Sequence, residues 1–269
     1  MEKTQIKITA LQMGAEIGDK NKNFSKVENL LSNINKTDII ILPEVWNVGW
    51  ACDKFIGSAE PIDNSETINF LSKLAKSKNS NIIGGSIIIK KNNEYYNTCP
   101  VINRNGELIA TYDKMHLYSY YGCNEGNYLT IGEVPILVDI EGVNIGLTIC
   151  YDIRFPEIYR AYRKAGADIL VNVAAWSHTK PTPWEVMTKS RATENQTYMI
   201  AINQYGAIGD KDFNLGHSRI IDYNGNVLSE ILDKEGIIEA SLNLPEMYEF
   251  RDKCTVLNDI KESYEVKSI

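Results

Sequence analysis

Long apolar runs are missing from this chain of 269 residues. A helix that crosses a bilayer needs about 20 consecutive apolar residues, and no stretch of the sequence approaches that length. The first residues also lack the basic segment followed by an apolar one that marks a secretory signal. We therefore expect a cytoplasmic protein that has no membrane partner.

Cysteine and histidine are also few. The chain has five cysteines, an odd number, at irregular spacings without a Cys-x-x-Cys pair, and three histidines. Regular, paired spacings usually mark a disulfide framework or a zinc site, so we expect neither. The sequence predicts a protein without metal or cofactor whose thiols are free. Four of the cysteines are predicted to serve only packing: Cys52, Cys99, Cys123 and Cys254.

The charge pattern argues against a nucleic-acid-binding protein. Asp and Glu (35) outnumber Lys and Arg (28), which gives a formal net charge of −7, and the basic residues form no stripe. We therefore expect no nucleic-acid partner. Hydrophobic residues make up 43% of the chain, enough for a large core, and no segment rich in Gly, Ser or Pro divides it. One domain over residues 1–269 is the prediction.

Strand-like and helix-like segments alternate along this domain. Residues 6–13 carry apolar side chains in the alternating pattern of a strand, and residues 24–34 carry them at helical spacing. Residues 82–89 read as another strand, in which Gly84 and Gly85 indicate a bulge or a close approach of two backbones. Such alternation is typical of mixed sheets covered by helices, an α/β fold.

Glu44, Lys114 and Cys150 each stand at the end of an apolar, strand-like segment. Neighbouring strands can end at one edge of a sheet, so these three side chains can converge there. A helix is predicted to begin at Pro156, which places the Cys150 thiol at a strand-to-helix turn with backbone N–H groups nearby. A thiol in that position is a candidate nucleophile.

The motifs around these residues resemble those of the nitrilase (carbon-nitrogen hydrolase) superfamily. They are Leu-Pro-Glu ending at Glu44, Tyr-Asp-Lys-Met-His-Leu around Lys114, and Ile-Cys-Tyr-Asp-Ile-Arg-Phe-Pro-Glu around Cys150. The resemblance implies a catalytic Glu-Lys-Cys triad on a four-layer α-β-β-α sandwich. In that triad Cys150 attacks the carbonyl carbon and Glu44 carries protons. Lys114 holds the oxyanion together with the backbone N–H of Tyr151.

Glu125 is a fourth catalytic candidate, in the loop between Lys114 and Cys150. The resemblance implies that a Glu in this loop orients the substrate and supports the lysine. The alternative is an ordinary solvated turn, because residues 124–127 have the composition of one.

The candidates for substrate binding have competing structural interpretations. Arg154 either binds a substrate carboxylate with both of its nitrogens or forms ion pairs around the turn with Asp152 and Glu157. The aromatic candidates either line the pocket or belong to the core. The four substrate-binding candidates are Tyr118, Tyr151, Arg154 and Trp176.

The residues after the cysteine are similar to those of the Nit/ω-amidase-like branch, which deamidates ω-amides of dicarboxylic acids. The resemblance implies a hydrolase that converts a small primary amide into a carboxylate and ammonia through an acyl-thioester. An N-carbamoyl amidohydrolase, a nitrilase and a catalytically silent binding protein stay open as alternatives. A cysteine–histidine protease is disfavoured, because His116, His178 and His217 stand in unrelated contexts without a protease signature.

The resemblance also implies assembly, since family members commonly pair through helices beside the nucleophile turn. The helix expected over residues 155–165 carries Ile158, Tyr159 and Tyr162 among basic residues, a surface suited to a two-fold interface. The tail from about residue 254 is partly apolar but too short to form a core. We expect it to dock on a partner subunit, in a homodimer or a larger homo-oligomer.

Overall fold

Two large β-sheets dominate the computed structural model, which describes residues 5–120, 123–208, 212–261 and 263–269. Within these ranges the strands form an eight-stranded sheet, a six-stranded sheet and a two-stranded ribbon. In spatial order the eight-stranded sheet contains β16 (Gly236–Asn243), β1 (Gln5–Gln12), β2 (Ile39–Ile41), β4 (Asn81–Ile83), β6 (Glu94–Ile102), β5 (Ile87–Lys91) and β3 (Glu60–Pro61), with β7 (Leu108–Asp113) paired to β6. The six-stranded sheet contains β15 (Val227–Ile231), β14 (Ser218–Ile221), β11 (Tyr198–Asn203), β10 (Ile169–Ala174), β9 (Val143–Ile149) and β8 (Leu137–Ile140). The ribbon pairs β12 (Tyr205–Ile208) with β13 (Asp212–Leu215).

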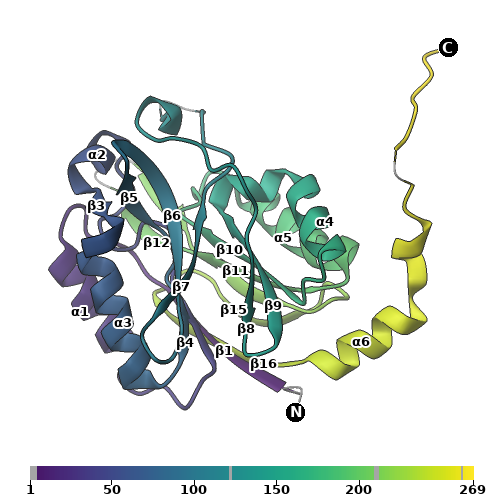
Figure 1. Ribbon diagram of the computed structural model, residues 1–269, viewed down its shortest axis with the longest axis horizontal. Helices are drawn as coiled ribbons and strands as arrows, with labels where there is room; N and C mark the ends of the chain where they lie inside the picture. Colours follow the sequence, from purple (N-terminus) through teal and green to yellow (C-terminus); the bar gives the residue numbers. More distant parts are fainter. Residues whose placement is uncertain (1–4, 121–122, 209–211, 262) are drawn as a thin grey trace.

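Helices cover the outer faces of the two large sheets. The α-helices are α1 (Lys20–Leu30), α2 (Phe55–Ser58), α3 (Glu66–Lys78), α4 (Pro156–Lys164), α5 (Pro181–Asn195) and α6 (Leu244–Lys253). Figure 1 shows α1 and α3 on one side of the sheets and α4 and α5 on the other. This arrangement confirms the predicted single-domain α-β-β-α sandwich. Each sheet is apolar on both faces, so each face needs a covering layer.

The side chains of β1 pack into two different core clusters, one on each face of its sheet. Ile6, Ile8 and Ala10 alternate along the strand and lie in a core cluster shared with the second sheet, which contributes residues such as Val171. Leu11 belongs to a different cluster that includes the apolar faces of α1 and α3. The strand is therefore buried on both faces, and the reactive residues at strand ends are held by a rigid framework.

Two predicted boundaries need correction. The helix expected over residues 24–34 is α1, which begins at Lys20 because the Asp19 side chain accepts the backbone N–H of Lys22 at 3.1 Å and caps the helix there. The strand expected over residues 82–89 is interrupted between β4 and β5. The interruption contains the two glycines, and it brings the backbone of Gly85 against the turn that follows β2.

Gly85 shows the close approach of two backbones that the glycine pair indicated. Its φ is +66°, and a Cβ added there would overlap the carbonyl oxygen of Pro43, next to Glu44. We expect Gly85→Ala to lower the free energy of unfolding by at least about 2 kcal/mol, from strain plus overlap. Chemical denaturation measures this loss.

Gly142→Ala is the matched control for Gly85→Ala. Gly142 has a φ of +86°, but a Cβ there would meet no atom within 4 Å. This variant has the backbone strain without the overlap, so its loss should be about 1 kcal/mol. Equal losses in the two variants would show that the backbones at Gly85 and Pro43 are not in close contact.

Candidate active site

Glu44 stands in the turn that follows β2, and this turn is held tightly. The next residue, Val45, has a φ of +45°, an uncommon conformation for a β-branched side chain. The Val45 N–H donates to Ser86 Oγ at 3.1 Å, and the Trp46 indole N–H donates to the Gly84 carbonyl oxygen at 2.8 Å. Both acceptors, Ser86 and Gly84, lie in the segment between β4 and β5. These two bonds hold the turn and thereby fix the direction of the Glu44 carboxylate.

Cys150 stands where β9 ends and a single 3-10 turn, Cys150–Arg154, begins. Its φ is +45°, in the left-handed region that residues other than glycine rarely occupy. The buried Asp152 carboxylate holds this turn, because it accepts the Ile149 N–H at 2.9 Å and the Tyr112 hydroxyl at 2.7 Å. The sharp turn places Cys150 at the edge of the core, where it lines a cavity.

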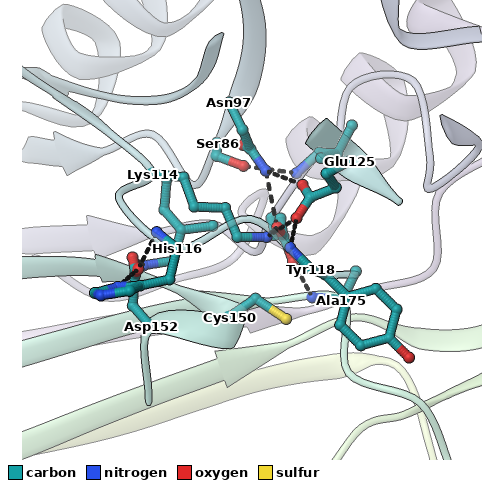
Figure 2. Close-up of polar contacts among 12 residues, drawn as sticks. Ser86, Asn97, Lys114, His116, Tyr118, Glu125, Cys150, Asp152 and Ala175 are labelled. Atoms are coloured by element: carbon teal, nitrogen blue, oxygen red, sulfur yellow. Dashed lines mark hydrogen bonds and ion pairs between the residues drawn. The ribbon is translucent and has the colours of Figure 1, made fainter. Parts of the chain in front are cut away.

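Lys114 lies between two carboxylates. Its Nζ is 2.9 Å from Glu44 Oε1 and 2.8 Å from Glu125 Oε2, and all three side chains have no exposed surface. The structure thus brings the predicted Glu44, Lys114 and Glu125 together, and Glu125 is not part of a solvated turn. Figure 2 shows the Lys114 ammonium within this cluster and the Cys150 sulfur beneath it.

Electrostatics in this cluster set the resting protonation states. Burial alone would lower the pKa of Lys114, but the carboxylates of Glu125 and Glu44 outweigh it and raise that pKa, so the lysine stays a cation. Burial, then the Glu44 charge, raises the pKa of the Cys150 thiol well above its ordinary value. The resting thiol is therefore protonated near neutral pH and needs a base to become a nucleophile.

The carboxylate of Glu44 is oriented for this role. Its Oε1 accepts from Lys114 and from Asn97 Nδ2, at 2.9 Å each, while its Oε2 accepts the Ala175 N–H at 2.8 Å. Glu125 is held similarly, since its Oε2 also accepts the Tyr118 N–H at 2.6 Å. Each carboxylate thus has a fixed orientation beside the thiol.

A cavity of about 400 Å³ opens onto Cys150. All four predicted substrate-binding residues line it, so the structure brings them together with the nucleophile candidate. The cavity also touches Trp50, Cys123 and the segment that precedes α5. The lining residues that were predicted are Tyr118, Tyr151, Arg154 and Trp176.

Arg154 faces this cavity, one of the two placements that the sequence left open. Its guanidinium carbon lies 4.9 Å from the centre of the Trp176 ring and 5.8 Å from that of Tyr151. Among the described residues, no carboxylate forms an ion pair with Arg154. Asp152, the partner considered for it, instead contacts the His116 ring at 2.7 Å.

Comparisons with known proteins agree with this geometry. The family model for carbon-nitrogen hydrolases matches residues 7–252. The chain belongs to the carbon-nitrogen hydrolase family. It is 34% identical over 256 residues to a 2-oxoglutaramate amidase of Bacillus subtilis (strain 168), covering 95% of this chain and 97% of that protein.

Further relatives confirm the predicted branch of this carbon-nitrogen hydrolase. The chloroplastic omega-amidase of Arabidopsis thaliana is 34% identical over 237 residues, which cover 84% of this chain and 64% of that protein. The crystal structure of Saccharomyces cerevisiae Nit3, a member of branch 10 of the nitrilase superfamily, matches with a TM-score of 0.85 and 28% identity. That match covers 94% of this chain and 95% of Nit3.

Asn97 is a site residue that the sequence analysis missed. Besides its bond to Glu44, its Nδ2 lies 3.4 Å from Glu125 Oε1, so one amide touches both carboxylates of this carbon-nitrogen hydrolase. In the sequence Asn97 is only a polar residue within a strand-like segment, and its burial in β6 becomes visible in the structure. No short motif surrounds it, because its partners come from distant segments.

The cysteine prediction was partly wrong. Cys52 and Cys123 form a disulfide, although their irregular spacing indicated free thiols. The bond joins the segment after Trp50 to the loop that carries Glu125, and Cys123 lines the cavity. Cys99 is free and packs in the core between the sheets, as predicted. Tyr121 and Gly122 of the same loop lie outside the described residues.

The described residues offer no group of three His, Cys, Asp or Glu side chains arranged to hold a metal ion. The three histidines contact groups other than the Cys150 thiol: His116 contacts Asp152, His178 contacts Phe213 and His217 contacts Glu185. In the part of the chain that the structure describes, none of the helices is both long and apolar enough to cross a membrane.

Proposed function

We propose that this carbon-nitrogen hydrolase cleaves a small primary amide, with Cys150 as nucleophile, Glu44 as general base and Lys114 as the cation that holds the oxyanion. The arrangement that carries the proposal is the Lys114 ammonium, buried between two carboxylates beside a protonated thiol. Glu125 keeps this ammonium in place. A buried, fixed charge stabilises a developing oxyanion without reorganisation.

The steps balance with these groups alone. As Cys150 Sγ attacks the carbonyl carbon, its proton passes to Glu44, and the oxyanion forms beside Lys114 Nζ and the Tyr151 N–H. Glu44 then protonates the departing nitrogen, which leaves as ammonia, and an acyl-thioester remains. Glu44 next takes a proton from water, which attacks the thioester. The resulting intermediate collapses as its C–S bond breaks, and Glu44 returns the proton to Cys150 Sγ. The products are a carboxylic acid and the restored thiol.

The proposed substrates are ω-amides of dicarboxylic acids. Relatives named 2-oxoglutaramate amidase and omega-amidase support this class. The cavity supports it as well, because Tyr118, Tyr151 and Trp176 give it aromatic walls and Arg154 gives it a positive charge. The four residues are therefore proposed as substrate contacts.

Ammonia release from a panel of primary amides, N-carbamoyl amino acids and nitriles tests this function. We expect ammonia from the amides, most from those with a distal carboxylate, and no carbon dioxide. Release of carbon dioxide from carbamoyl compounds would indicate an N-carbamoyl amidohydrolase, and turnover of nitriles alone a nitrilase. No product from any of them would favour a catalytically silent binding protein.

We also propose a homodimer or a multiple of one. Of the two features that suggested it, the helix α4 and the C-terminal tail, only the tail supports it. The prediction that the apolar face of α4 forms the interface is wrong, because Ile158, Tyr159 and Tyr162 pack in the protein's own core. The tail supports the proposal instead. Figure 1 shows the chain after α6 running away from the sheets, and Val266 and Ile269 are exposed there.

Light scattering of the purified chain measures its assembly. We expect at least twice the chain mass of 30.4 kDa at micromolar concentration, and a lower mass when residues 261–269 are deleted. A fully active particle of single-chain mass would contradict the dimer, and unchanged assembly after the deletion would exclude the tail as its cause.

A cytoplasmic location stays a prediction. The disulfide between Cys52 and Cys123 does not favour this location, because disulfides are rare in the reducing cytoplasm. Mapping of alkylated cysteines in freshly lysed source cells tests it. A reduced pair fits the cytoplasm, and an oxidised pair would favour an oxidising compartment.

A further inference from the structure

The Asn97 side chain reaches both carboxylates of the buried cluster from β6. It has no exposed surface, and its Nδ2 lies 2.9 Å from Glu44 Oε1 and 3.4 Å from Glu125 Oε1. Figure 2 shows the side chain pointing toward Glu125 and Lys114. The backbone oxygen of Asn97 also accepts the Lys114 N–H at 2.9 Å, beside the end of β7. One residue thus contacts all three members of the cluster.

The orientation of this amide follows from its two charged partners. The opposite orientation would place the amide oxygen against two carboxylates, which have no proton to donate while they are ionised. In the observed orientation Asn97 Oδ1 is buried, and among the described residues it accepts no hydrogen bond. A buried acceptor without a donor costs free energy. The contribution of this side chain therefore lies in its N–H groups.

Two carboxylates that share one ammonium tend to hold a proton, because like charges at close range disfavour full ionisation. Burial raises the pKa of Glu125, Lys114 lowers it less, and the charge of Glu44 raises it further. A proton held on this pair would remove the base that the Cys150 thiol needs. Hydrogen-bond donors to the charged forms oppose that uptake.

Among the described residues, the Asn97 amide is the neutral donor that both carboxylates share. Each carboxylate also accepts one backbone N–H of its own, from Ala175 for Glu44 and from Tyr118 for Glu125. Removal of the amide would leave each carboxylate with that single neutral donor and a share of the ammonium.

The charged groups around the pair give it little further support. In the described part of the chain, Lys114 is the one cation within ion-pair distance of these carboxylates, and the Cys150 thiol adds a negative charge when it ionises. The acids next to these two residues along the chain already have partners. They are Asp113, which lies 2.7 Å from Lys91, and Asp152, which lies 2.7 Å from His116.

We propose that Asn97 is a positioning residue that keeps Glu44 and Glu125 ionised together, so that Glu44 can take the proton of the Cys150 thiol. The inference rests on the proposed function and extends it to a residue away from the substrate, since Asn97 is not among the described residues that line the cavity. Without its N–H groups the pair takes up a proton from solvent, and Glu44 no longer serves as a base.

Asn97→Leu tests this role, because leucine has a similar size and no donor. We expect kcat/KM for a primary amide to fall ~10–100-fold near neutral pH, with most of the loss in kcat. The acid limb of the pH profile should move up by about one pH unit or more, since loss of the donor favours the protonated pair. Asn97→Val, which is smaller and suits a strand, should show the same shift.

Asn195→Leu is the matched control. Asn195 is equally buried in α5, its Nδ2 donates to the Arg191 carbonyl oxygen at 2.9 Å, and its Oδ1 also has no partner among the described residues. This variant should lose stability but keep the wild-type position of the acid limb. An unshifted limb in both Asn97 variants, or an equal shift in Asn195→Leu, would overturn the inference.

Infrared spectroscopy of protein with carbon-13 in its glutamate carboxyl groups detects the proton directly, without turnover. Near neutral pH we expect no buried glutamic acid in the wild-type protein, one in Asn97→Leu, and none when Glu125→Gln is added to that variant. A protonated glutamate in the wild type, none in Asn97→Leu, or one that persists with Glu125→Gln would overturn the role of Asn97, whether or not amides are hydrolysed. Absence of ammonia from all primary amides would instead overturn the proposed function.

Discussion

Cys150→Ala is expected to lower kcat for amide hydrolysis by at least about 10⁴-fold, because among the described residues that line the cavity the other cysteine, Cys123, is held in a disulfide and cannot form the acyl-thioester. The protein should still fold, since the substitution removes one atom that lines a cavity and leaves the Asp152 bonds to the turn intact. Cys150→Ser should be nearly as inactive, because an alkoxide is much harder to generate than a thiolate. Steady-state ammonia release, with circular dichroism to check folding, measures both effects.

Cys99→Ala is the matched control for Cys150→Ala. Cys99 is a free, buried thiol in the core between the sheets and does not line the cavity. Its replacement should cost about 1 kcal/mol of stability and leave kcat within about twofold of wild type. If Cys150→Ala kept activity within tenfold of wild type, the nucleophile would be another group.

Lys114→Met is expected to lower kcat by ~10²–10³-fold or more, because the oxyanion would lose its fixed positive charge. The structure adds a second consequence. Glu44 and Glu125, both without exposed surface, would face each other unpaired. Breaking a buried pair in this way typically costs about 3–5 kcal/mol of stability, so thermal unfolding should shift clearly downward.

The double variant Lys114→Met with Glu125→Gln separates these two consequences. It removes one of the stranded charges, so part of the lost stability should return, while kcat should stay low. A recovery of kcat together with stability would show that Lys114 supports the fold rather than the reaction. An altered KM with unchanged kcat in Lys114→Met would show that it only binds substrate.

Local sequence motifs predicted the main parts of the candidate site because each reactive residue follows its own strand. Glu44, Lys114 and Cys150 could be found from a few neighbouring residues, and the structure brings the first two within 2.9 Å. The layered fold was also predictable, since the apolar alternation of strands such as β1 extends over both faces.

Features that depend on distant segments were not predictable in the same way. Asn97 becomes a site residue only when β6 lies beside the turn after β2, and nothing around it in the sequence marks this. Cys52 and Cys123 are 71 residues apart, and their pairing depends on where two loops meet. The apolar face of α4 fits a partner or its own core equally well by pattern, and here it covers the core.

Partitioning between water and hydroxylamine tests the central claim, hydrolysis through an acyl-enzyme, most directly. A primary amide and the methyl ester of the same acid are hydrolysed at one fixed hydroxylamine concentration, and the ratio of hydroxamate to free acid is measured for each. If both substrates form the same thioester on Cys150, the ratio must be identical, because the leaving group has gone before the ratio is set. Different ratios, or acid without hydroxamate from either substrate, would contradict a common acyl-enzyme.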